Sequence, residues 1–274
     1  MPATIHPPPR VMAGKSSSRD YLSFSAVSLF AACPLRYYFR YIAGLPEDTV
    51  RASLMFGAAF HAGVEWHFRD LLIGRPAPDI DTLLAVFWDT WQARAATTIR
   101  FTKGEDINTV GQLADRMFAA FQKSAFARPN GTIIGIEEEL RGELIPGLPD
   151  LLARVDLLVD TGDALELTDF KTSRARWDAD DITDSASQLL LYHELAKLLA
   201  DGRPLRLRFA VLTKAKSPEL SHFPVAADAL QIERTKQVVY QIWRAIQSGH
   251  FYPSPSPIQC PTCPYRAPCR AWTG

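Results

Sequence analysis

The sequence lacks several features that would place it in a specialised class of protein. No uninterrupted apolar run approaches the ~18 residues of a membrane span, and the first residues lack the apolar core of a secretion signal. No internal repeat is visible, and the formal net charge is +0. These absences argue against a membrane protein, a secreted protein and a repeat array, so we expect a cytoplasmic protein. With no net charge, nucleic acid could be bound only by a local basic patch.

Cysteine is scarce, with four residues in the chain of 274. Cys33 stands alone, whereas Cys260, Cys263 and Cys269 cluster near the C-terminus. Without a secretion signal, clustered cysteines indicate a metal more than disulfide bonds. Three thiolates fall one short of the set that a structural zinc ion or an iron–sulfur cluster takes, and Cys33 is the only other candidate. The alternative is a flexible tail with three unligated thiols.

What is present is an ordinary composition with a clear change of period along the chain. Hydrophobic residues make up 47% and charged residues 22%, the balance of a soluble globular enzyme. Residues 1–20 have no periodicity and predict a disordered tail. Helical periods cover 25–41, 54–72, 80–100, 108–126, 184–200 and 226–248. Strand patterns cover 132–140, 143–145, 151–159, 164–170 and 205–212. This order predicts an α/β fold with a mixed central sheet.

Two of the predicted strands carry charges among apolar residues. Asp156 lies in the middle of the first apolar run, and Asp169 and Lys171 close the second. Because side chains alternate across a strand, Asp169 and Lys171 share one face and Phe170 points the other way. Two carboxylates and an ammonium group in apolar surroundings are costly unless something compensates them. A divalent cation would do so, as in metal-dependent phosphodiester cleavage. The alternative is a surface salt bridge on a half-exposed sheet.

Two pairs of polar residues lie four positions apart on predicted helices, so each pair shares a helix face. His61 and Glu65 form the first pair, and the small residues around them would let another element approach closely. Gln188 and Tyr192 form the second pair, on the helix that follows the strands. Taken alone, a single histidine on a helix is more often packed or solvated than a metal ligand. The second pair alone fits the polar stripe of an amphipathic helix.

The segments around the cysteines are basic and aromatic. Residues 21–45 and 251–274 contain no acidic residue, and their basic residues are Arg36, Arg40, Arg266 and Arg270. Arginine for phosphates and aromatic rings for bases are the side chains that single-stranded nucleic-acid binding uses. For most of the aromatic residues we expect the alternative, which is a place in the core.

Together and in this order, the motifs resemble the PD-(D/E)XK nucleases of the RecB type. Within them the similarity is to the iron–sulfur branch, which includes the nuclease domain of AddB and the stand-alone exonucleases linked to CRISPR adaptation. The resemblance covers roughly residues 22–272. It rests on these segments: Cys33-Pro34 with Arg36 and Tyr37-Tyr38-Phe39, His61, Asp156, Asp169-Phe170-Lys171-Thr172, Gln188 with Tyr192, and the three C-terminal cysteines.

The resemblance implies a fold, a domain organisation and a set of site residues. The fold is a restriction-endonuclease-like core with a mixed central β-sheet flanked by helices. One nuclease domain would span 21–274, with a helical insertion at 54–127 and a Cys-rich cap at 251–274. The implied ligands of one or two Mg²⁺ or Mn²⁺ ions are His61, Asp156, Asp169 and the carbonyl of Phe170. The implied catalytic residues are Asp156, Asp169, Lys171, Gln188 and Tyr192. A structural 4Fe–4S cluster, or alternatively a zinc ion, would be held by Cys33, Cys260, Cys263 and Cys269.

The implied function is that of a metal-dependent DNA exonuclease acting on single-stranded DNA or DNA ends in recombination or repair. One alternative is the processing of DNA ends for CRISPR spacer acquisition. Another is a binding module on the same fold that has lost catalysis. The sequence lacks a complete phosphate-binding loop, since Pro9 stands at its first glycine position. A helicase would therefore be a separate partner, as would CRISPR adaptation proteins, and we expect no membrane partner.

Overall fold

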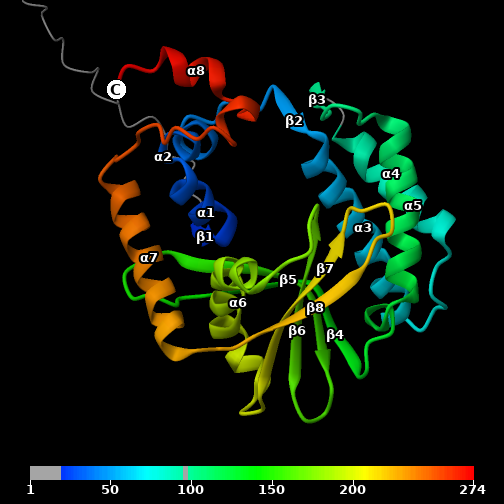
Figure 1. Ribbon diagram of the computed structural model, residues 1–274. Coiled ribbons are helices and arrows are strands. Elements are labelled where there is room, and N and C mark those ends of the chain that lie inside the picture. The colour runs from blue at the N-terminus through cyan, green and yellow to red at the C-terminus, as the bar shows by residue number, and fades with distance from the viewer. Residues whose placement is uncertain (1–19, 95–97) are drawn as a thin grey trace, which may run out of the picture.

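The computed structural model of the protein describes residues 20–94 and 98–274. The tail predicted for residues 1–20 therefore lies outside the described residues, apart from Asp20. The described part is built around one mixed sheet with helices on both faces (Figure 1). No helix in it combines the length and the hydrophobicity that crossing a bilayer requires.

The central sheet has the strand order β1-β5-β6-β7-β8, and β4 pairs with β5 outside this path. Its strands are β1 (Tyr21–Ser23), β4 (Thr132–Gly142), β5 (Asp150–Asp160), β6 (Leu165–Ser173), β7 (Leu205–Thr213) and β8 (Leu220–Val225). The pairs β1–β5 and β6–β7 are parallel, and the others are antiparallel. The predicted mixed α/β fold is confirmed. A second, two-stranded sheet joins β2 (Thr49–Arg51) to β3 (Thr98–Arg100).

The helices lie in three groups along the chain. The N-terminal group is α1 (Phe24–Ala32), α2 (Pro34–Tyr37) and η1 (Tyr38–Ile42). The group before the main strands is α3 (Ala52–Leu72), α4 (Ile80–Ala93), α5 (Ile107–Lys123) and η2 (Ala125–Ala127). The remaining helices are α6 (Ala179–Ala200), α7 (Ala229–Gln247), η3 (Cys260–Thr262) and α8 (Arg266–Ala271). The helices predicted between residues 54 and 127 are present as α3, α4 and α5. The prediction over 80–100 is wrong at its end, because α4 stops at Ala93 and residues 98–100 form β3.

The N-terminal helical segment is broken where a continuous helix was predicted over 25–41. Cys33 has extended backbone angles, φ −164° and ψ 103°. The ring of Pro34 disfavours helical geometry in the residue before it, so one helix ends at Cys33 and the next begins at Pro34. The first of these helices is capped by Ser23, whose hydroxyl accepts from the N–H of Ala26 at 3.3 Å.

Two strand predictions differ from the structure at the margins of the sheet. Residues 143–145 form no strand, because β4 ends at Gly142 and the chain turns before β5. Strand β8 was not predicted, since Pro224 and polar residues interrupt its apolar pattern. Because β8 pairs only with β7, at the edge of the sheet, a proline without an N–H is tolerated there.

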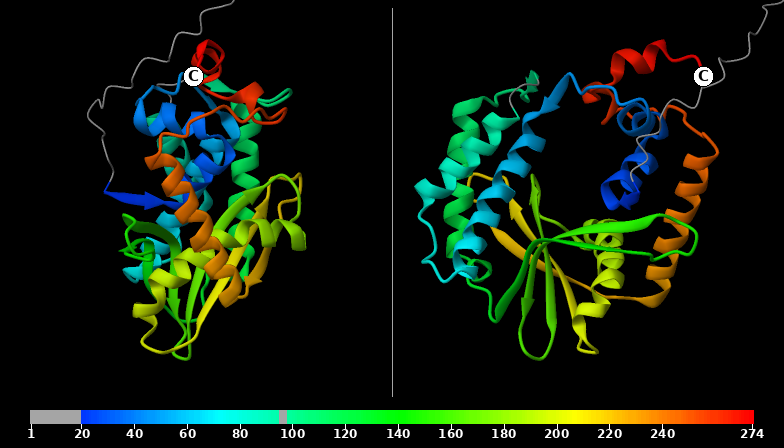
Figure 2. Two further views of the ribbon diagram at one scale, coloured as in Figure 1. Left: turned by 90° about the vertical axis from the view of Figure 1, so that its left-hand side faces the viewer. Right: turned by 180° about the vertical axis from the view of Figure 1, so that it is seen from behind.

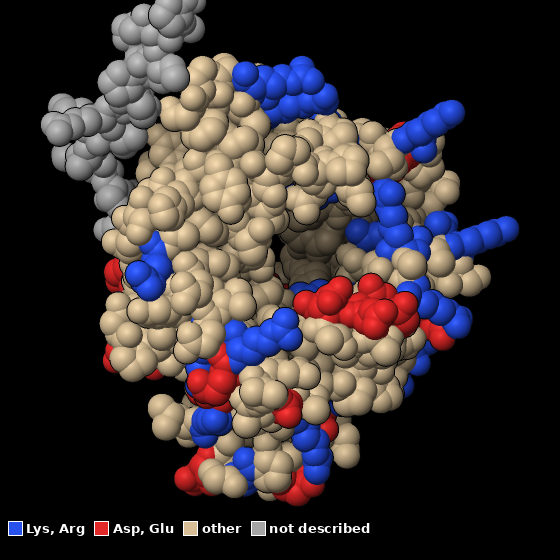
Figure 3. Space-filling view, turned by 60° about the vertical axis from the view of Figure 1, so that its left-hand side comes forward, with Lys and Arg blue, Asp and Glu red and all other residues tan. Residues whose placement is uncertain are grey.

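Helices cover both faces of the sheet (Figure 2). Three apolar clusters hold them there. The first lies between the sheet and α3–α5, and includes Phe60, Phe118 and Phe170. The second lies between the sheet and α6, and the third joins α1 and α7 to the start of β5. Figure 3 shows that the surface is hollowed in the middle of the molecule, with acidic side chains on the lower edge of the hollow and Lys and Arg along its right side.

Candidate active site

The site begins at a fork between β5 and β6. One edge of β5 pairs with β1 over Asp150–Leu152 and with β6 only over Leu157–Asp160. Asp156 lies where β6 leaves this edge. The N–H of Phe170, which no longer meets a strand partner there, donates to Asp156 Oδ2 at 2.6 Å. A buried backbone N–H requires an acceptor. The Asp156 carboxylate accepts this hydrogen bond, and the bond holds the carboxylate in the fork.

Glu137 lies opposite Asp156 on the neighbouring strand β4. The pairs Ile136↔Leu157 and Glu138↔Val155 place these two acidic residues across from each other. Glu137 has a positive φ of 51°, a left-handed conformation that costs a non-glycine residue about 1–3 kcal/mol. The alternation of side chains along β5 is interrupted here, since Leu157 packs toward α3–α5 and Val155, two residues earlier, packs toward α6. Strained backbone at such a point is typical of functional sites.

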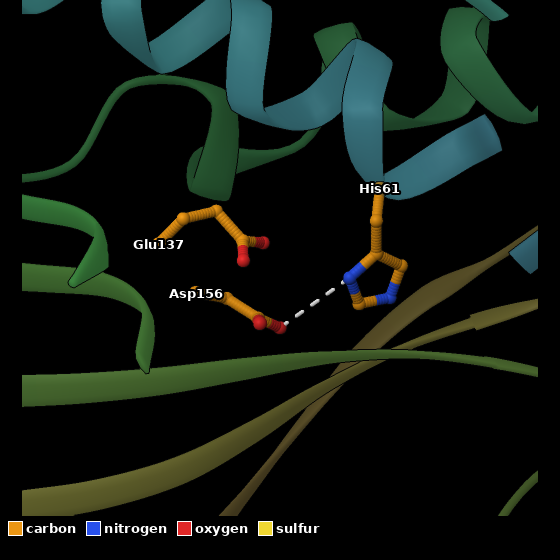
Figure 4. Close-up of side chains that lie close together, drawn as sticks. All are labelled: His61, Glu137 and Asp156. Carbon is orange, nitrogen blue, oxygen red and sulfur yellow. Dashed lines mark ion pairs between the residues drawn. The ribbon is translucent and has the colours of Figure 1, made fainter. Parts of the chain in front are cut away.

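His61 on α3 completes this group from the opposite side (Figure 4). Its Nδ1 lies 3.6 Å from Asp156 Oδ2, and one ligand atom each of His61, Glu137 and Asp156 lies within 4.8 Å of the others. Burial lowers the pKa of His61, while Asp169 and the Phe170 backbone act in the opposite direction. A neutral imidazole is the form that binds metal. The structure therefore places His61 at the acidic fork rather than in an unrelated packed position.

The charges of this group are not balanced by the protein. Burial raises the pKa of Asp156 well above its usual range, and the nearby Asp169 adds to the shift. Burial and then Asp156 raise the pKa of Glu137 to about 7. A divalent cation among these carboxylates would relieve both effects. Two carboxylates and an imidazole suit Mg²⁺ or Mn²⁺, so the residues present fit a divalent metal.

Asp169 and Lys171 share one face of β6, as the alternation predicts. Lys171 Nζ lies 2.7 Å from Asp169 Oδ2. Phe170 points the other way, into the cluster under α3–α5, with its ring 5.8 Å from that of Phe68. Asp169 is only 2% exposed, which excludes the alternative of a surface salt bridge.

Gln188 and Tyr192 on α6 contact the same charges. The Gln188 side chain donates to Asp169 Oδ1 at 2.8 Å and to the Tyr192 hydroxyl at 3.0 Å, and it accepts from Lys171 Nζ at 2.8 Å. Burial raises the pKa of Tyr192 to about 12, so its hydroxyl stays protonated. These residues therefore hold the Asp169–Lys171 pair in place and are not a solvated polar stripe.

The four cysteines lie together beside α2, away from the acidic fork. Cys33 and the three C-terminal cysteines line one cavity of about 230 Å³, and all four are free thiols. Leu35, Phe39 and Tyr265 form the apolar cluster beside it. The Tyr265 hydroxyl donates to the Leu45 carbonyl at 3.3 Å, which joins the C-terminal segment to the N-terminal one. The predicted convergence of Cys33 with the other three is thus present, and the thiols are not in a free tail.

Most of the basic residues predicted near the cysteines lie at the cysteine cavity. Arg36, Arg266 and Arg270 line the cysteine cavity, and Arg40 pairs with Glu47 at 3.2 Å. The Arg36 Nε is buried and has no hydrogen-bond partner among the described residues. The aromatic side chains of Tyr37, Phe39 and Tyr265 are buried, as expected for core residues.

Comparison with known proteins shows the family to which the chain belongs. The family model of the PD-(D/E)XK nuclease superfamily matches residues 21–270. The chain therefore belongs to the PD-(D/E)XK nuclease superfamily, whose nucleases use divalent metals, and DNA is the substrate that this fold implies. No curated protein matches the sequence.

Two solved structures are similar to the chain. One is a candidate exonuclease from Eubacterium rectale, with a TM-score of 0.57 and 15% identity over 92% of this chain and 88% of that chain. The other is the protein SSO0001, with a TM-score of 0.35 and 16% identity over 87% of this chain and 92% of that chain. The first supports the fold, and the second carries no argument.

Glu137 is the site residue that the sequence reasoning missed. The signal was the run Glu137-Glu138-Glu139 inside an otherwise apolar strand. The sequence could not say which of the three faces the metal group, because that depends on the strand register and on the positive φ of Glu137.

We expect Glu137→Gln to weaken Mn²⁺ binding by at least about 10-fold, the loss typical when a residue supporting a metal site is removed. The substitution keeps the size of the side chain and removes a negative charge that lies opposite Asp156. Calorimetric titration with Mn²⁺ measures it. Glu138→Gln is the matched control, because its side chain is exposed and its charge is the same. Equal affinities in the two variants would show that Glu137 is not a ligand.

Proposed function

We propose that the protein is a metal-dependent DNA exonuclease that hydrolyses phosphodiester bonds. The observation that carries the proposal is the group of buried and half-buried charges at the fork, where Asp156, Asp169 and Lys171 lie together beside His61 and Glu137. A module that only binds DNA has no reason to keep so costly a set of charges. The similarity in fold to a candidate exonuclease agrees with an exonuclease.

In the proposed reaction, each residue of the site would have one of three roles: binding the metal, orienting the water or positioning Lys171. Asp156, Asp169, His61 and Glu137, with the Phe170 carbonyl, would hold Mg²⁺ or Mn²⁺. When bound, the metal supplies Lewis acidity toward the scissile phosphate and acidifies a water molecule. Lys171, fixed by Asp169 and Gln188, would orient the attacking water and offset the charge that develops on the phosphate. Gln188 and Tyr192 would keep the Lys171 ammonium group in that position.

We further propose that the four cysteines hold a structural 4Fe–4S cluster, as in the RecB-type iron–sulfur branch. A tetrahedral zinc site has Zn–S bonds of about 2.3 Å, so its sulfurs lie about 3.8 Å apart. Among the described residues, no three of the four sulfurs lie within 4.8 Å of one another. The support for a cluster is that all four cysteines line one cavity of about 230 Å³. The buried Nε of Arg36 in that cavity wall would find an acceptor in such an anionic group.

The proposed role is the processing of single-stranded DNA or DNA ends in recombination or repair. Spacer acquisition in CRISPR adaptation is the alternative role for the same activity. A separate helicase or CRISPR adaptation proteins would then be the partners. We also propose that residues 21–274 act as one nuclease domain.

The test is the digestion of labelled DNA by the purified protein with Mg²⁺, Mn²⁺ or EDTA. We expect release of short products from linear single-stranded DNA with either metal, none with EDTA, and no cut in a circular strand of the same sequence. RNA of that sequence serves as the control substrate. Cleavage of the circle would make the enzyme an endonuclease, and the absence of cleavage in every metal would leave only a binding module.

A further inference from the structure

Two neighbouring strands end together beside the site and carry the same pattern of cations. Strands β6 and β7 are parallel and paired up to Ser173↔Thr213. The N–H of Lys214 donates to the Ser173 carbonyl at 2.6 Å, which extends the pairing by one residue. The sequences that follow are Arg174-Ala175-Arg176 after β6 and Lys214-Ala215-Lys216 after β7. Four basic residues therefore follow the C-terminal ends of two neighbouring strands.

These strand ends lie close to the proposed catalytic residue Lys171. Arg174 follows Lys171 by three residues, or about 10 Å along a strand at ~3.3 Å per residue. Each strand of duplex DNA rises about 3.4 Å per nucleotide. A strand with its scissile phosphate at Lys171 would therefore bring phosphates about three nucleotides away to these cations. Figure 3 shows Lys and Arg side chains along one side of the central hollow.

Lys214 is held in position without a carboxylate. Its Nζ donates to the Ser53 carbonyl at 3.2 Å and lies 4.7 Å from the centre of the Phe56 ring. Neither partner carries a charge, and within the described part of the chain Lys214 forms no ion pair. Burial, and then the nearby Arg174, lower the pKa of Lys214 to about 8, and the charge of Glu105 offsets this only in part. An anion beside both cations would compensate the burial and the repulsion together.

The opposite end of β7 provides a contrast. There Arg206 pairs with Asp163 at 2.6 Å, and Arg208 pairs with Glu166 at 2.9 Å. At the end near the site, only Arg176 has such a partner, Glu219. Arg174, Lys214 and Lys216 form no ion pair among the described residues. The unbalanced positive charge of this strand pair is thus confined to the end next to the catalytic residues.

We propose that Arg174, Arg176, Lys214 and Lys216 form a two-loop site that binds the backbone phosphates of the DNA strand being cut. The proposal rests on the proposed nuclease function and adds the residues that would position the substrate. Contacts to phosphates carry no sequence information, so the two-loop site would hold any sequence in register with Lys171. It would also supply the local basic patch that a chain with a net charge of +0 requires.

The test compares the salt dependence of KM and kcat for a labelled single strand in the wild type and in the double variant Arg174→Gln/Lys214→Gln. Each phosphate contact to a single strand contributes about 0.7 to the slope of log K against log salt. Losing two contacts should reduce the slope by about 1.4 and raise KM about 25-fold at 0.1 M salt. We expect kcat and thermal stability to stay near those of the wild type. Lys214→Arg should retain the wild-type KM.

Lys123→Gln is the control, because it removes an exposed cation at the end of α5. An unchanged KM and slope in the double variant would overturn the two-loop site. A fall in kcat without a change in KM would overturn it as well, since the loops would then act on the chemistry. Binding of the same strand to Lys171→Ala protein in EDTA, with and without the two substitutions, is measured in parallel. Failure of the wild type to cleave contradicts the nuclease, whereas equal binding in this pair contradicts the two-loop site.

Discussion

Lys171→Ala should lower the rate of DNA cleavage by roughly 10²–10⁴-fold, the range for loss of one catalytic group. The Lys171 ammonium group lies 2.7 Å from Asp169 and 2.8 Å from the Gln188 carbonyl oxygen, so its place at the fork is fixed. Removing it takes away the positive charge that would face the attacking water. Asp169 keeps its hydrogen bond from Gln188, so we expect the variant to fold.

The measurement is single-turnover cleavage of labelled DNA together with binding of the same DNA. Lys197→Ala is the matched control, because Lys197 is a surface residue of α6 that pairs with Glu194. We expect Lys197→Ala to cleave like the wild type and Lys171→Ala to bind DNA without cutting it. Cleavage by Lys171→Ala at the wild-type rate would mean that this lysine is structural and that the site is assigned wrongly.

Cys33→Ala should lose bound iron as completely as Cys263→Ala, although Cys33 lies more than 200 residues away in sequence. The C-terminal cysteines supply three ligands to the cavity that Cys33 also lines, and the chain has no other cysteine. The ligation would close a loop that spans most of the chain. Its loss should therefore reduce the free energy of unfolding by about 2–5 kcal/mol, as for other long-loop crosslinks.

Iron and zinc content, visible absorption and thermal unfolding of the purified variants decide this prediction. Thr262→Ala is the control, since it lies between two of the cysteines and removes no sulfur. We expect iron in the wild type and the control and none in Cys33→Ala. A full metal complement in Cys33→Ala would show that another group is the fourth ligand, and zinc in place of iron would refute the cluster.

The parts of the site that follow from local rules could be predicted from the sequence. The shared face of Asp169 and Lys171 follows from the period of a strand, and both lie as predicted. The meeting of Cys33 with the distant cysteines follows from the number of ligands that a metal or cluster takes. Asp156 is a candidate ligand on the sequence alone, because a carboxylate inside an apolar strand is costly.

The parts that depend on tertiary packing could not be predicted. Glu137 faces Asp156 only because of the β4–β5 register and its own positive φ, and neither is visible in a local pattern. The two-loop site depends on β6 and β7 ending at the same level. The helix break at Cys33 follows from a known rule for the residue before proline, but the apolar pattern on both sides of it favoured one continuous helix.

The most direct test of the central claim is the cleavage of labelled single-stranded DNA across a Mn²⁺ titration, in the wild type and in Asp156→Ala and Asp169→Ala. The account predicts cleavage that rises with Mn²⁺ and saturates in the wild type, and none in either variant at any concentration. Both variants should still bind DNA. Saturating, Mn²⁺-dependent cleavage in either variant, with the affinity of the wild type for the metal, would contradict a shared metal site at the fork.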